Sequence, residues 1–371
     1  MHRVLITGGA GFIGSHLADE LLRRGHEVRA LDVLSPQVHG GEARRPEYLS
    51  RDVELIEGDC RDPGVVRKAL RGVDVVYHLA AAVGVGQSMY EVRHYVEANN
   101  TATAVLLEAL IETPVKRLVV ASSMSIYGEG LYRRPDGTIV ENAERDQARV
   151  RGGDWETRDR DGTTLQPIPT PETKRPSLAS VYALTKYDQE RLCLLIGDAY
   201  DIPTTAMRFF NVYGPRQALG NPYTGVLAIF ASRILNGNPP LIFEDGEQKR
   251  DFVSVYDVAR ACALALDAPA SHGRTINVGS GESRSVKDVA DAMLRALDRK
   301  DIQPEVTGKF RVGDVRHCFA DISLARDVLG YRPQVEFQKG VQELAEWLRG
   351  QQAVDRVDAM KEELAKRGLV V

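Results

Sequence analysis

The chain has 371 residues, of which 43% are hydrophobic and 27% are charged, and its formal net charge is -4. This length exceeds one ordinary domain, and the composition is that of a globular protein with an ample core. The net charge provides no basic surface for nucleic acid or an anionic membrane, although a local basic pocket for a diphosphate is compatible with it. We therefore expect a small-molecule enzyme with no nucleic-acid partner.

The cysteines and the apolar segments predict the compartment. Cys60, Cys193, Cys262 and Cys318 are far apart and form no Cys-x-x-Cys pair or Cys/His cluster at zinc spacing. We expect reduced thiols and no metal, as in the cytoplasm. No charged-then-apolar leader precedes the first strand, and no apolar run reaches the roughly 18 residues of a spanning helix, so we expect neither secretion nor membrane insertion.

The first predicted element is a buried strand followed by a glycine turn and the start of a helix. Gly8 permits the tight turn, Gly11 lets the backbone approach a pyrophosphate, and Gly14 lets the helix pack on the strand. The helix N-terminus then faces the anion. A second strand, 27–31, leads into Asp32, which can accept hydrogen bonds from an adenosine ribose and would repel a 2′-phosphate. This series predicts NAD rather than NADP.

The following segments alternate between strand and helix patterns. The predicted strands are 53–56, 73–78, 117–121 and 204–209, and the predicted helices are 63–70, 90–112 and 180–198. Near-continuous apolar strands between helices are typical of a parallel sheet covered on both faces. We therefore expect a doubly wound α/β fold of the Rossmann type, in which the strand at 204–209 completes the nucleotide-binding sheet.

The pattern divides the chain into three parts. We expect residues 1–210 to form the NAD-binding domain, residues 211–350 a smaller α/β substrate lobe interleaved with it, and residues 351–371 a helical tail. Residues 129–176 have little apolar periodicity, and a loop of that length is uncommon in a compact domain, so we expect a functional flap or a small subdomain. The tail carries apolar residues at helical spacing from Val354 onward, which can pack on the body or on a second subunit.

Two groups of polar residues are candidates for the chemistry. Tyr182 and Lys186 are four residues apart in a predicted helix, so both side chains can point into one pocket. A tyrosine is a poor base at neutral pH and needs nearby positive charge, which Lys186 and a nicotinamide ring can supply. Ser123 follows a predicted strand at the edge where open α/β sheets bind their ligands, and it can hold a substrate hydroxyl against Tyr182.

These motifs resemble those of the extended short-chain dehydrogenase/reductases and, within them, the NAD-dependent nucleotide-sugar epimerases and dehydratases. The resemblance runs from residue 2 to about residue 348. Besides the glycine turn and Tyr182 with Lys186, it rests on Gly58-Asp59-Cys60-Arg61-Asp62, His78-Leu79-Ala80-Ala81, Asn99, Ser123 and Arg208-Phe209-Phe210-Asn211-Val212-Tyr213-Gly214-Pro215. The insertion at 129–176 departs from the family pattern, as does Cys60, where the family usually has an aliphatic residue.

The resemblance implies a role for each matching residue. Tyr182 is the expected base, Lys186 is expected to hold the nicotinamide ribose, and Ser123 is expected to hold the sugar hydroxyl. The residues expected to bind NAD with Tyr182 and Lys186 are Gly8, Gly11, Phe12, Ile13, Gly14, Asp32, Asp59, Cys60, Leu79, Ala80, Ala81 and Asn99. Those expected to bind substrate with Ser123 are Ser88, Asn211, Arg250 and Arg316. A guanidinium fork matches phosphate oxygens, although each arginine alone is equally compatible with a surface ion pair.

The residues after Ser123 limit which reaction of this family we expect. Enzymes resembling the sugar 4,6-dehydratases carry Asp and Glu where this chain has Met124 and Ser125, which cannot exchange protons as carboxyl groups do. We therefore expect epimerisation of a nucleoside-diphosphate sugar at C4 through a transient 4-keto intermediate. Residues 34–40, 86–90 and 221–225 resemble a dTDP-L-rhamnose 4-epimerase-like subgroup, which implies interconversion of dTDP-L-rhamnose and dTDP-6-deoxy-L-talose.

Several alternatives remain open at this point. A 4-ketosugar reductase would use the same Ser123, Tyr182 and Lys186 but would exchange free NAD(P)H. A UDP-sugar 4-epimerase of the glucose/galactose or glucuronate type would share the motifs, whereas a non-catalytic dinucleotide sensor would lack the tyrosine and lysine pair. The resemblance also implies a homodimer formed through the helices at 90–112 and 180–198.

Overall fold

A parallel sheet of seven strands forms the centre of the computed structural model, which describes residues 1–40, 44–218, 225–311, 314–351 and 357–370. The strands are β1 (Arg3–Thr7), β2 (Glu27–Asp32), β3 (Glu54–Glu57), β4 (Val75–His78), β5 (Arg117–Ser123), β9 (Thr204–Phe209) and β14 (Arg274–Val278). Their order is β14-β9-β5-β4-β1-β2-β3, and every pairing is parallel. The predicted doubly wound α/β fold is therefore confirmed.

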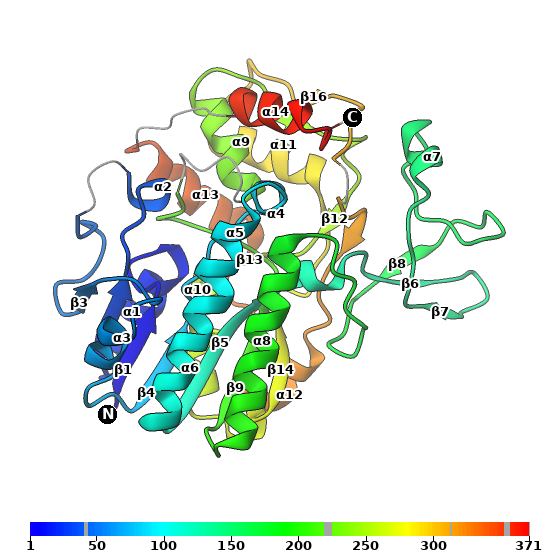
Figure 1. Cartoon of the computed structure of the whole chain (residues 1–371). Coiled ribbons are helices and arrows are strands. Elements are labelled where there is room, and N and C mark those ends of the chain that lie inside the picture. Colours follow the sequence, from blue (N-terminus) through cyan, green and yellow to red (C-terminus); the bar gives the residue numbers. More distant parts are fainter. Residues whose placement is uncertain (41–43, 219–224, 312–313, 352–356, 371) are drawn as a thin grey trace.

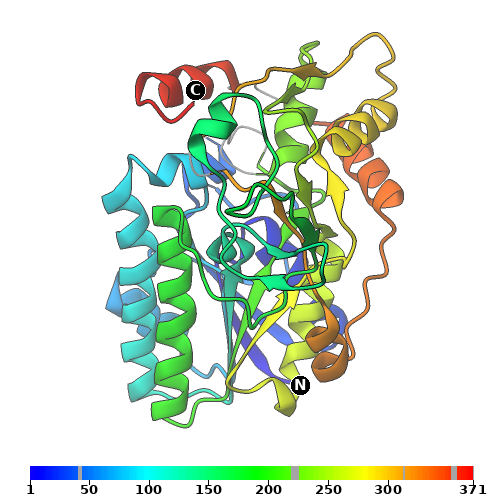
Figure 2. The same ribbon diagram turned by 90° about the vertical axis from the view of Figure 1, so that its right-hand side faces the viewer.

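Helices cover both faces of this sheet (Figures 1 and 2). One layer contains α1 (Phe12–Arg23), α10 (Val255–Leu266) and α12 (Ser323–Leu329), and the other contains α3 (Pro63–Ala69), α6 (Ala102–Glu112) and α8 (Val181–Ala199). Successive strand residues point to opposite faces. Val4 and Ile6 accordingly belong to the first buried core and Leu5 to the second. Both faces of the sheet are buried under helices, which explains why its strands are nearly continuous runs of apolar residues.

The sheet ends at β14 and not at the strand 204–209, so that expectation was wrong. β14 comes after α10 and pairs with β9, which brings the chain back from the second region to the edge of the sheet. Its sequence alternates polar and apolar residues, unlike the apolar runs used to find the other strands. Asn277 is buried because it accepts a hydrogen bond from Tyr127 Oη at 2.7 Å. Asn277, a polar residue whose hydrogen bond is made inside the protein, therefore interrupts the apolar pattern from which the other strands were predicted.

The predicted helix at 90–112 is interrupted. The structure has α5 (Val92–Tyr95), a π-helical turn η1 (Val96–Thr101) and then α6. Such turns widen a helix locally and are frequent at functional sites. Here the turn contains Asn99, whose fully buried side chain points toward α8 and donates to Thr185 Oγ1 at 2.9 Å.

The second region surrounds its own core. Its helices are α9 (Val226–Leu235), α11 (Val286–Ala296) and α13 (Phe337–Leu348), and they share an apolar cluster that includes Phe230, Met293 and Leu344. Its short strands are β10 (Asn211–Tyr213), β11 (Leu241–Ile242), β12 (Lys249–Arg250), β13 (Phe252–Ser254), β15 (Arg284–Ser285), β16 (Glu305–Val306) and β17 (His317–Cys318). Elsewhere, the chain also forms the short helices α2 (Pro36–His39), α4 (Val85–Ser88), η2 (Met124–Tyr127) and η3 (Pro269–Ser271).

The insertion at 129–176 is a small subdomain that projects from the body (Figure 1). It contains a three-stranded sheet of β6 (Leu131–Arg133), β7 (Ile139–Val140) and β8 (Gln166–Ile168), with the short helix α7 (Gln147–Arg151). Tyr132, Ala143 and Leu165 form a minimal core. Few apolar residues are needed for so small a core, which explains the weak periodicity.

The tail packs on the body of the chain. Helix α14 (Val357–Lys366) buries Met360 and Leu364 against Leu241, and the Arg367 guanidinium lies 4.2 Å from the centre of the Tyr90 ring. Val354, which the tail pattern included, lies outside the described residues. Among the described helices, none has the length and hydropathy needed to cross a membrane.

Candidate active site

A cavity of about 730 Å³ opens at the carboxyl ends of the central strands. This size is in the usual range for a small-molecule site, and the place is where doubly wound sheets bind ligands. The predicted site residues among its lining are Gly8, Gly11, Phe12, Ile13, Gly14, Asp32, Asp59, Cys60, Leu79, Ala80, Ala81, Ser123, Tyr182, Lys186 and Asn211. The fold thus brings together residues that are more than two hundred positions apart in sequence.

The glycine turn leaves room for a dinucleotide. Gly8 has φ +70°, and a Cβ on Gly14 would lie only 2.2 Å from the Gly8 carbonyl oxygen, so neither position accepts a side chain without strain. In the part of the chain that the structure describes, no side chain caps the N-terminus of α1, and no acidic residue lies in its first turn. The free N–H groups and the helix dipole therefore face the cavity without a competing anion, which fits the pyrophosphate of NAD.

The ribose end of the cavity is organised by Asp32. Its carboxylate accepts hydrogen bonds from the backbone N–H groups of Ala10 at 3.0 Å and Leu34 at 2.9 Å. His39, which our sequence analysis did not assign to the site, also lines the cavity, with Nε2 at 3.6 Å from Asp32 Oδ1. A negative charge at this point fits ribose hydroxyls and disfavours a 2′-phosphate.

Tyr182 lies in the first turn of α8, at the inner end of the cavity. Ser180 caps this helix by accepting a hydrogen bond from Ala183 N at 3.1 Å, which fixes the turn that carries the tyrosine. Burial raises the pKa of Tyr182, and a hydrogen bond with Ser123 opposes that rise. Ser123 Oγ in turn accepts hydrogen bonds from the N–H and the hydroxyl of Ser125, at 3.1 and 2.9 Å. A hydrogen bond that lowers the pKa of a tyrosine is donated to its oxygen, so the Ser123 hydroxyl lies within hydrogen-bonding distance of the Tyr182 hydroxyl.

Lys186 supplies positive charge one helical turn from Tyr182. Its side chain is buried but lines the cavity, and burial lowers the pKa of its ammonium to about 8. The ammonium donates a hydrogen bond to Gln189 Oε1 at 2.6 Å. A protonated Lys186 therefore favours the ionised form of a neighbouring tyrosine, as the base role requires.

Two predicted residues lie behind the cavity wall instead of lining it. Ser88 Oγ accepts a hydrogen bond from Tyr182 N at 3.0 Å and donates one to Val85 O at 2.7 Å, so its hydroxyl is used within the protein. Asn99 accepts from Ala82 N at 2.7 Å and so braces a segment that does line the cavity. Both side chains position the site from outside the ligand space.

Arg316 is also remote from the cavity, and its charge is neutralised within the protein. Its fully buried guanidinium contacts Glu156 Oε1 at 2.6 Å, Glu244 Oε2 at 3.1 Å and Asp245 Oδ1 at 2.6 Å. An arginine held by three carboxylates has no donor fork left for a diphosphate. The structure therefore places Arg316 outside the cavity lining, among carboxylates of the protein itself. Gly313 of the same motif lies outside the described residues.

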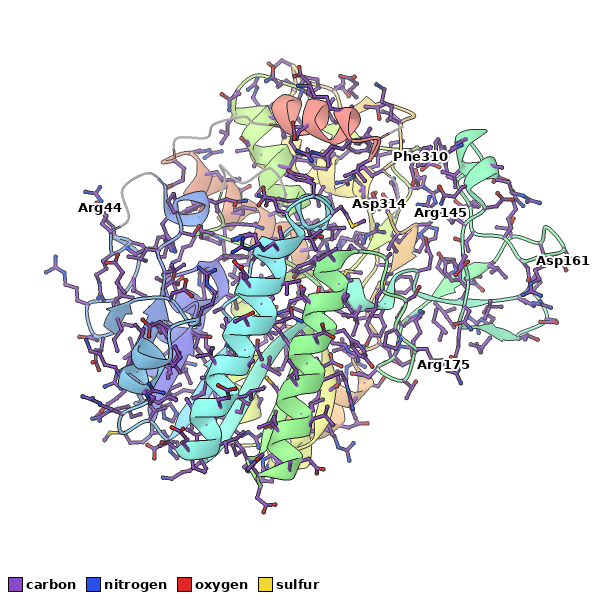
Figure 3. All side chains as sticks on the ribbon, viewed as in Figure 1. Arg44, Arg145, Asp161, Arg175, Phe310 and Asp314 are labelled. Atoms are coloured by element: carbon purple, nitrogen blue, oxygen red, sulfur yellow. The ribbon has the colours of Figure 1, made fainter. Side chains whose placement is uncertain are left out.

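This arginine belongs to a larger cluster that joins the insertion to the second region. We call Arg145, Arg316, Glu129, Glu156, Glu244 and Asp245 the charged junction. Arg145, from the insertion, contacts Glu244 at 2.6 Å and donates to the carbonyl of Asp314 at 2.5 Å (Figure 3). The projecting subdomain is thus fastened by buried ion pairs.

Arg250 has fewer carboxylate contacts than Arg316 among the described residues. It does not line the cavity itself but precedes Phe252, which does, and its guanidinium donates to the carbonyls of Lys249, Arg316 and Val315 and contacts Asp314 Oδ1 at 3.4 Å. Arg311 contacts the other oxygen of Asp314, also at 3.4 Å, and its guanidinium stacks 4.8 Å from the Phe243 ring centre. Sequence analysis overlooked Arg311, although it lies close to the Asp314 motif in the chain. Two arginines that share one acid retain net positive charge.

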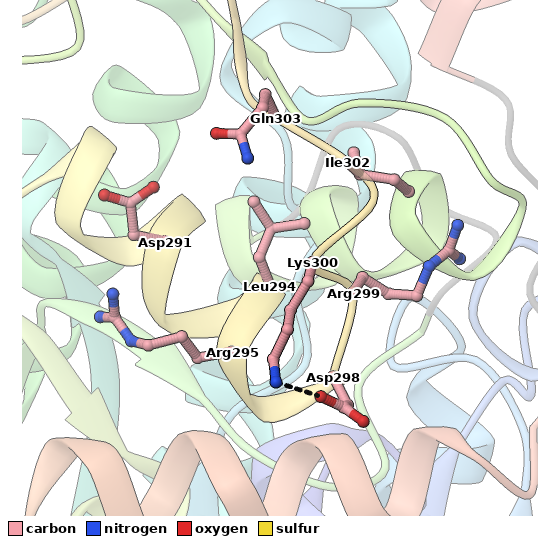
Figure 4. Close-up of a pocket in the computed structure, with 8 residues that line it drawn as sticks. All are labelled: Asp291, Leu294, Arg295, Asp298, Arg299, Lys300, Ile302 and Gln303. Carbon is pink, nitrogen blue, oxygen red and sulfur yellow. Dashed lines mark ion pairs between the residues drawn. The ribbon is translucent and has the colours of Figure 1, made fainter.

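A second hollow, of about 240 Å³, shares no lining residue with this cavity. Its polar lining residues are exposed or half-buried, and its Lys300–Asp298 pair is 3.9 Å apart with both side chains at least 80% exposed (Figure 4). It offers no buried polar group to a ligand. Within the described residues, no group of three His, Cys, Asp or Glu side chains could hold a metal ion.

Comparison with known proteins agrees with this geometry. Residues 4–149 and 161–279 match the model of the NAD dependent epimerase/dehydratase family. The chain is 35% identical over 358 residues to a dTDP-L-rhamnose 4-epimerase from Burkholderia thailandensis, covering 95% of this chain and 96% of that protein.

Two solved structures are similar along nearly the whole chain. The UDP-glucose 4-epimerase of Thermus thermophilus, in complex with NAD, has TM-score 0.74 and 34% identity, with 94% of this chain and 100% of that one covered. The UDP-glucuronic acid 4-epimerase of Bacillus cereus, in complex with UDP-glucuronic acid and NAD, has TM-score 0.73 and 29% identity, with 94% and 99% covered. Together with the family match and the NAD-shaped cavity, these findings show that the chain belongs to the NAD-dependent epimerase/dehydratase family.

Proposed function

We propose that this enzyme is a nucleotide-sugar 4-epimerase that interconverts dTDP-L-rhamnose and dTDP-6-deoxy-L-talose. The observation that carries the proposal is the joint placement of Ser123, Tyr182 and Lys186 at the inner end of an NAD-type cavity in which Met124 and Ser125 replace the acid and base of a dehydratase. The B. thailandensis relative supports the dTDP-sugar, and similar UDP-sugar epimerases keep UDP-sugars as the alternative to be tested.

The roles of the side chains follow from their contacts. NAD, when bound, supplies reversible hydride acceptance at C4, which passes the sugar through a 4-keto form. Ser123 holds the C4 oxygen, and Tyr182 takes the proton of that hydroxyl and later returns it. Lys186 keeps the tyrosine ionisable and holds the nicotinamide ribose. Because the cofactor is regenerated in every turnover, the enzyme needs no added NAD(H).

The charges of the cavity favour a neutral sugar over a uronic acid. Among the described residues that line it, Arg61 and Lys186 are the lysine and arginine side chains. Arg61 is already held by Asp59, with two nitrogens on its carboxylate, and Lys186 is assigned to the ribose. A sugar carboxylate would therefore lack a cation and pay a desolvation cost. The apolar side chains of Val85 and Met124, which also line the cavity, suit the methyl group of a 6-deoxyhexose.

The diphosphate of the substrate is assigned to Asn211 and Arg250. Asn211 lines the cavity, where its Nδ2 can donate to a phosphate oxygen, whereas its Oδ1, which has no hydrogen-bond partner among the described residues, can only accept. The Arg250 guanidinium lies close to this wall in sequence, and to reach the diphosphate it would exchange its contacts with the carbonyls of Lys249, Arg316 and Val315. Arg316 and Ser88 are left out of the ligand set because their donors and acceptors are used within the protein.

We also propose a homodimer that buries the helices α5, η1, α6 and α8 against their copies. Large apolar side chains are exposed on this surface: Val92 is 47%, Val96 42%, Leu184 46% and Leu195 57% exposed. Apolar residues gathered on neighbouring helices favour association. Sedimentation equilibrium should give twice the chain mass for the wild type and a single chain mass for the double variant Val96→Asp with Leu195→Asp. A monomeric wild type would contradict the dimer. The four buried, unpaired cysteines support a cytoplasmic location.

The test of the activity uses purified protein without added cofactor. It is incubated separately with dTDP-, UDP- and GDP-sugars, and the configuration at C4 is followed by NMR. We expect interconversion of the dTDP-6-deoxyhexoses. Isomerisation of UDP-sugars alone would replace the proposed substrate, and turnover that requires stoichiometric NAD(P)H would identify a ketosugar reductase instead.

A further inference from the structure

Gln189 lies beneath the catalytic pair at the centre of a buried polar network, and no motif assigned it a task. It is one helical turn after Lys186 on α8 and fully buried. We propose that Gln189 is a positioning residue that holds the Lys186 ammonium in place toward the cavity. The proposal rests on the functions assigned above to Tyr182 and Lys186, and it adds a residue that touches neither sugar nor cofactor.

Both ends of the Gln189 amide are engaged. Its Oε1 accepts the hydrogen bond from Lys186 Nζ at 2.6 Å, the short distance expected for a charged donor. Its Nε2 donates to Thr103 Oγ1 at 2.8 Å and lies 3.2 Å from His78 Nε2. The amide therefore links the catalytic helix to α6 and to strand β4. A side chain fixed at both ends cannot rotate away from the lysine.

The network is itself anchored in the sheet. His78 Nδ1 lies 2.7 Å from Thr7 Oγ1, at the end of β1 and just before the glycine turn. Thr103 Oγ1 donates to Asn99 O at 2.5 Å, in the π-helical turn. The position of Lys186 is thus set by four elements of the fold and not by its own helix alone. We regard Asn99 and Gln189 as one supporting layer behind the cavity.

The charges around Lys186 make the Gln189 contact decisive for its protonation. His78 is fully buried, and burial lowers its pKa to about 3, so it stays neutral. Burial raises the pKa of Cys193 to about 12, so this thiol is neutral too. Glu190 faces Lys186 from the same helix but is held by Arg208, with contacts of 2.6 and 2.9 Å. Tyr182, one helical turn before Lys186, lines the same cavity.

The sign of the pH effect follows from these contacts. Lys186 acts as a cation, so activity should fall as the pH rises through its pKa. Removing the neutral acceptor favours the uncharged amine and lowers that pKa, whereas a carboxylate in its place favours the ammonium and raises it. Gln189→Leu and Gln189→Glu should therefore move the alkaline fall in opposite directions. General loss of stability would not produce opposite shifts.

The experiment compares the full-length enzyme with Gln189→Leu, Gln189→Glu and Thr205→Val. Thr205 donates a buried hydrogen bond to Ser271 O at the opposite end of the sheet and serves as the control for lost buried polarity. We expect Gln189→Leu to lower kcat about 10- to 100-fold with little change in the sugar KM, as misplacement of a catalytic group does. The alkaline fall in kcat should move to lower pH for Gln189→Leu and to higher pH for Gln189→Glu, and it should not move for Thr205→Val.

A second readout does not depend on turnover. NAD binding to the NAD-free protein is measured by calorimetry across the same pH range. As the pH rises, the loss of NAD affinity should begin at a lower pH for Gln189→Leu than for the wild type. Unshifted profiles, or shifts of the same sign for both variants, would overturn the positioning role. If Lys186→Met kept full activity, the role assigned to Lys186 would fail, and absence of any isomerisation by the wild type would contradict the proposed function itself, so these controls separate both cases from a wrong role for Gln189.

Discussion

The cavity floor and the charged junction both bury polar side chains, but they do so in opposite ways. On the floor, hydroxyl, amide and imidazole groups surround Lys186, and among the described residues no side chain of opposite charge is in direct contact with it. In the junction, Arg316 meets three carboxylates. Unpaired charge is available to a ligand, whereas paired charge holds parts of the protein together. An arginine in a family motif can therefore serve either purpose.

The largest effect on the floor should come from Tyr182→Phe. Only the hydroxyl is lost, so the fold and the dinucleotide cleft persist while the proton acceptor disappears. We expect kcat to fall by about 10²- to 10⁴-fold, the usual contribution of a general base. Single-turnover assays by NMR would measure it, and the absorbance of released cofactor would show that NAD is retained. Activity within threefold of wild type would refute the base assignment.

The largest effect in the junction should be on stability. Arg316→Met leaves Glu244 and Asp245 without their shared cation, and breaking a buried pair costs about 3–5 kcal/mol of unfolding free energy. Urea unfolding at pH 7 would measure this loss. Arg23→Met, which removes the exposed pair with Glu20, is the matched control and should leave the unfolding midpoint nearly unchanged. Equal midpoints for the two variants would contradict the account of the junction.

Arg250→Ala tests the boundary between the two regions. If its guanidinium meets the substrate diphosphate, the loss of a charged hydrogen bond worth about 1.5–3 kcal/mol should raise the nucleotide-sugar KM about 10- to 100-fold. The amount of NAD that copurifies with the enzyme should not change. Equal losses of sugar and NAD binding would show that Arg250 supports the fold, as Arg316 does.

The smallest effect should come from Glu156→Gln at the rim of the junction. Hydrogen bonds from His317 and Arg316 lower the pKa of Glu156 to about 2, and its side chain is 37% exposed. Because the folded pKa is depressed, the stabilisation is present above the unfolded pKa and fades as the pH falls toward 2. We expect about 1 kcal/mol at pH 7, discounted for solvent screening.

This pH dependence is open to a direct check. The gap between the urea midpoints of the wild type and Glu156→Gln should narrow steadily from pH 5 to pH 3. A gap that widens on acidification would reverse the sign of the argument.

The contrast between the two regions also explains what could be predicted from the sequence. The dinucleotide cleft depends on backbone shape, and glycines at fixed spacing, a strand-end Asp32 and a one-turn separation of Tyr182 and Lys186 all report that shape locally. The resemblance to a known family then predicted the reaction and the role of each residue. Strand β14 was missed because Asn277, an internally satisfied polar residue, interrupts the apolar pattern.

Pairing between distant residues left no such local signal. The partners of Arg316 come from positions 156, 244 and 245, so its neutralisation depends on tertiary structure alone. Ser88 was assigned to substrate from its motif, yet the fold uses it to receive the Tyr182 N–H. Gln189 was visible as a residue three positions after Lys186, but only its contacts show what it holds.

The most direct test of the central claim follows the hydrogen on C4. dTDP-L-rhamnose deuterated at C4 is incubated with the enzyme in ordinary water, without added cofactor, and the epimer is analysed by NMR. We predict 6-deoxytalose product that keeps its deuterium at C4, because Tyr182 exchanges only the hydroxyl proton, whereas the C4 hydrogen moves as a hydride that does not exchange with water. Loss of the deuterium to solvent, or dependence on added NAD(P)H, would contradict the account.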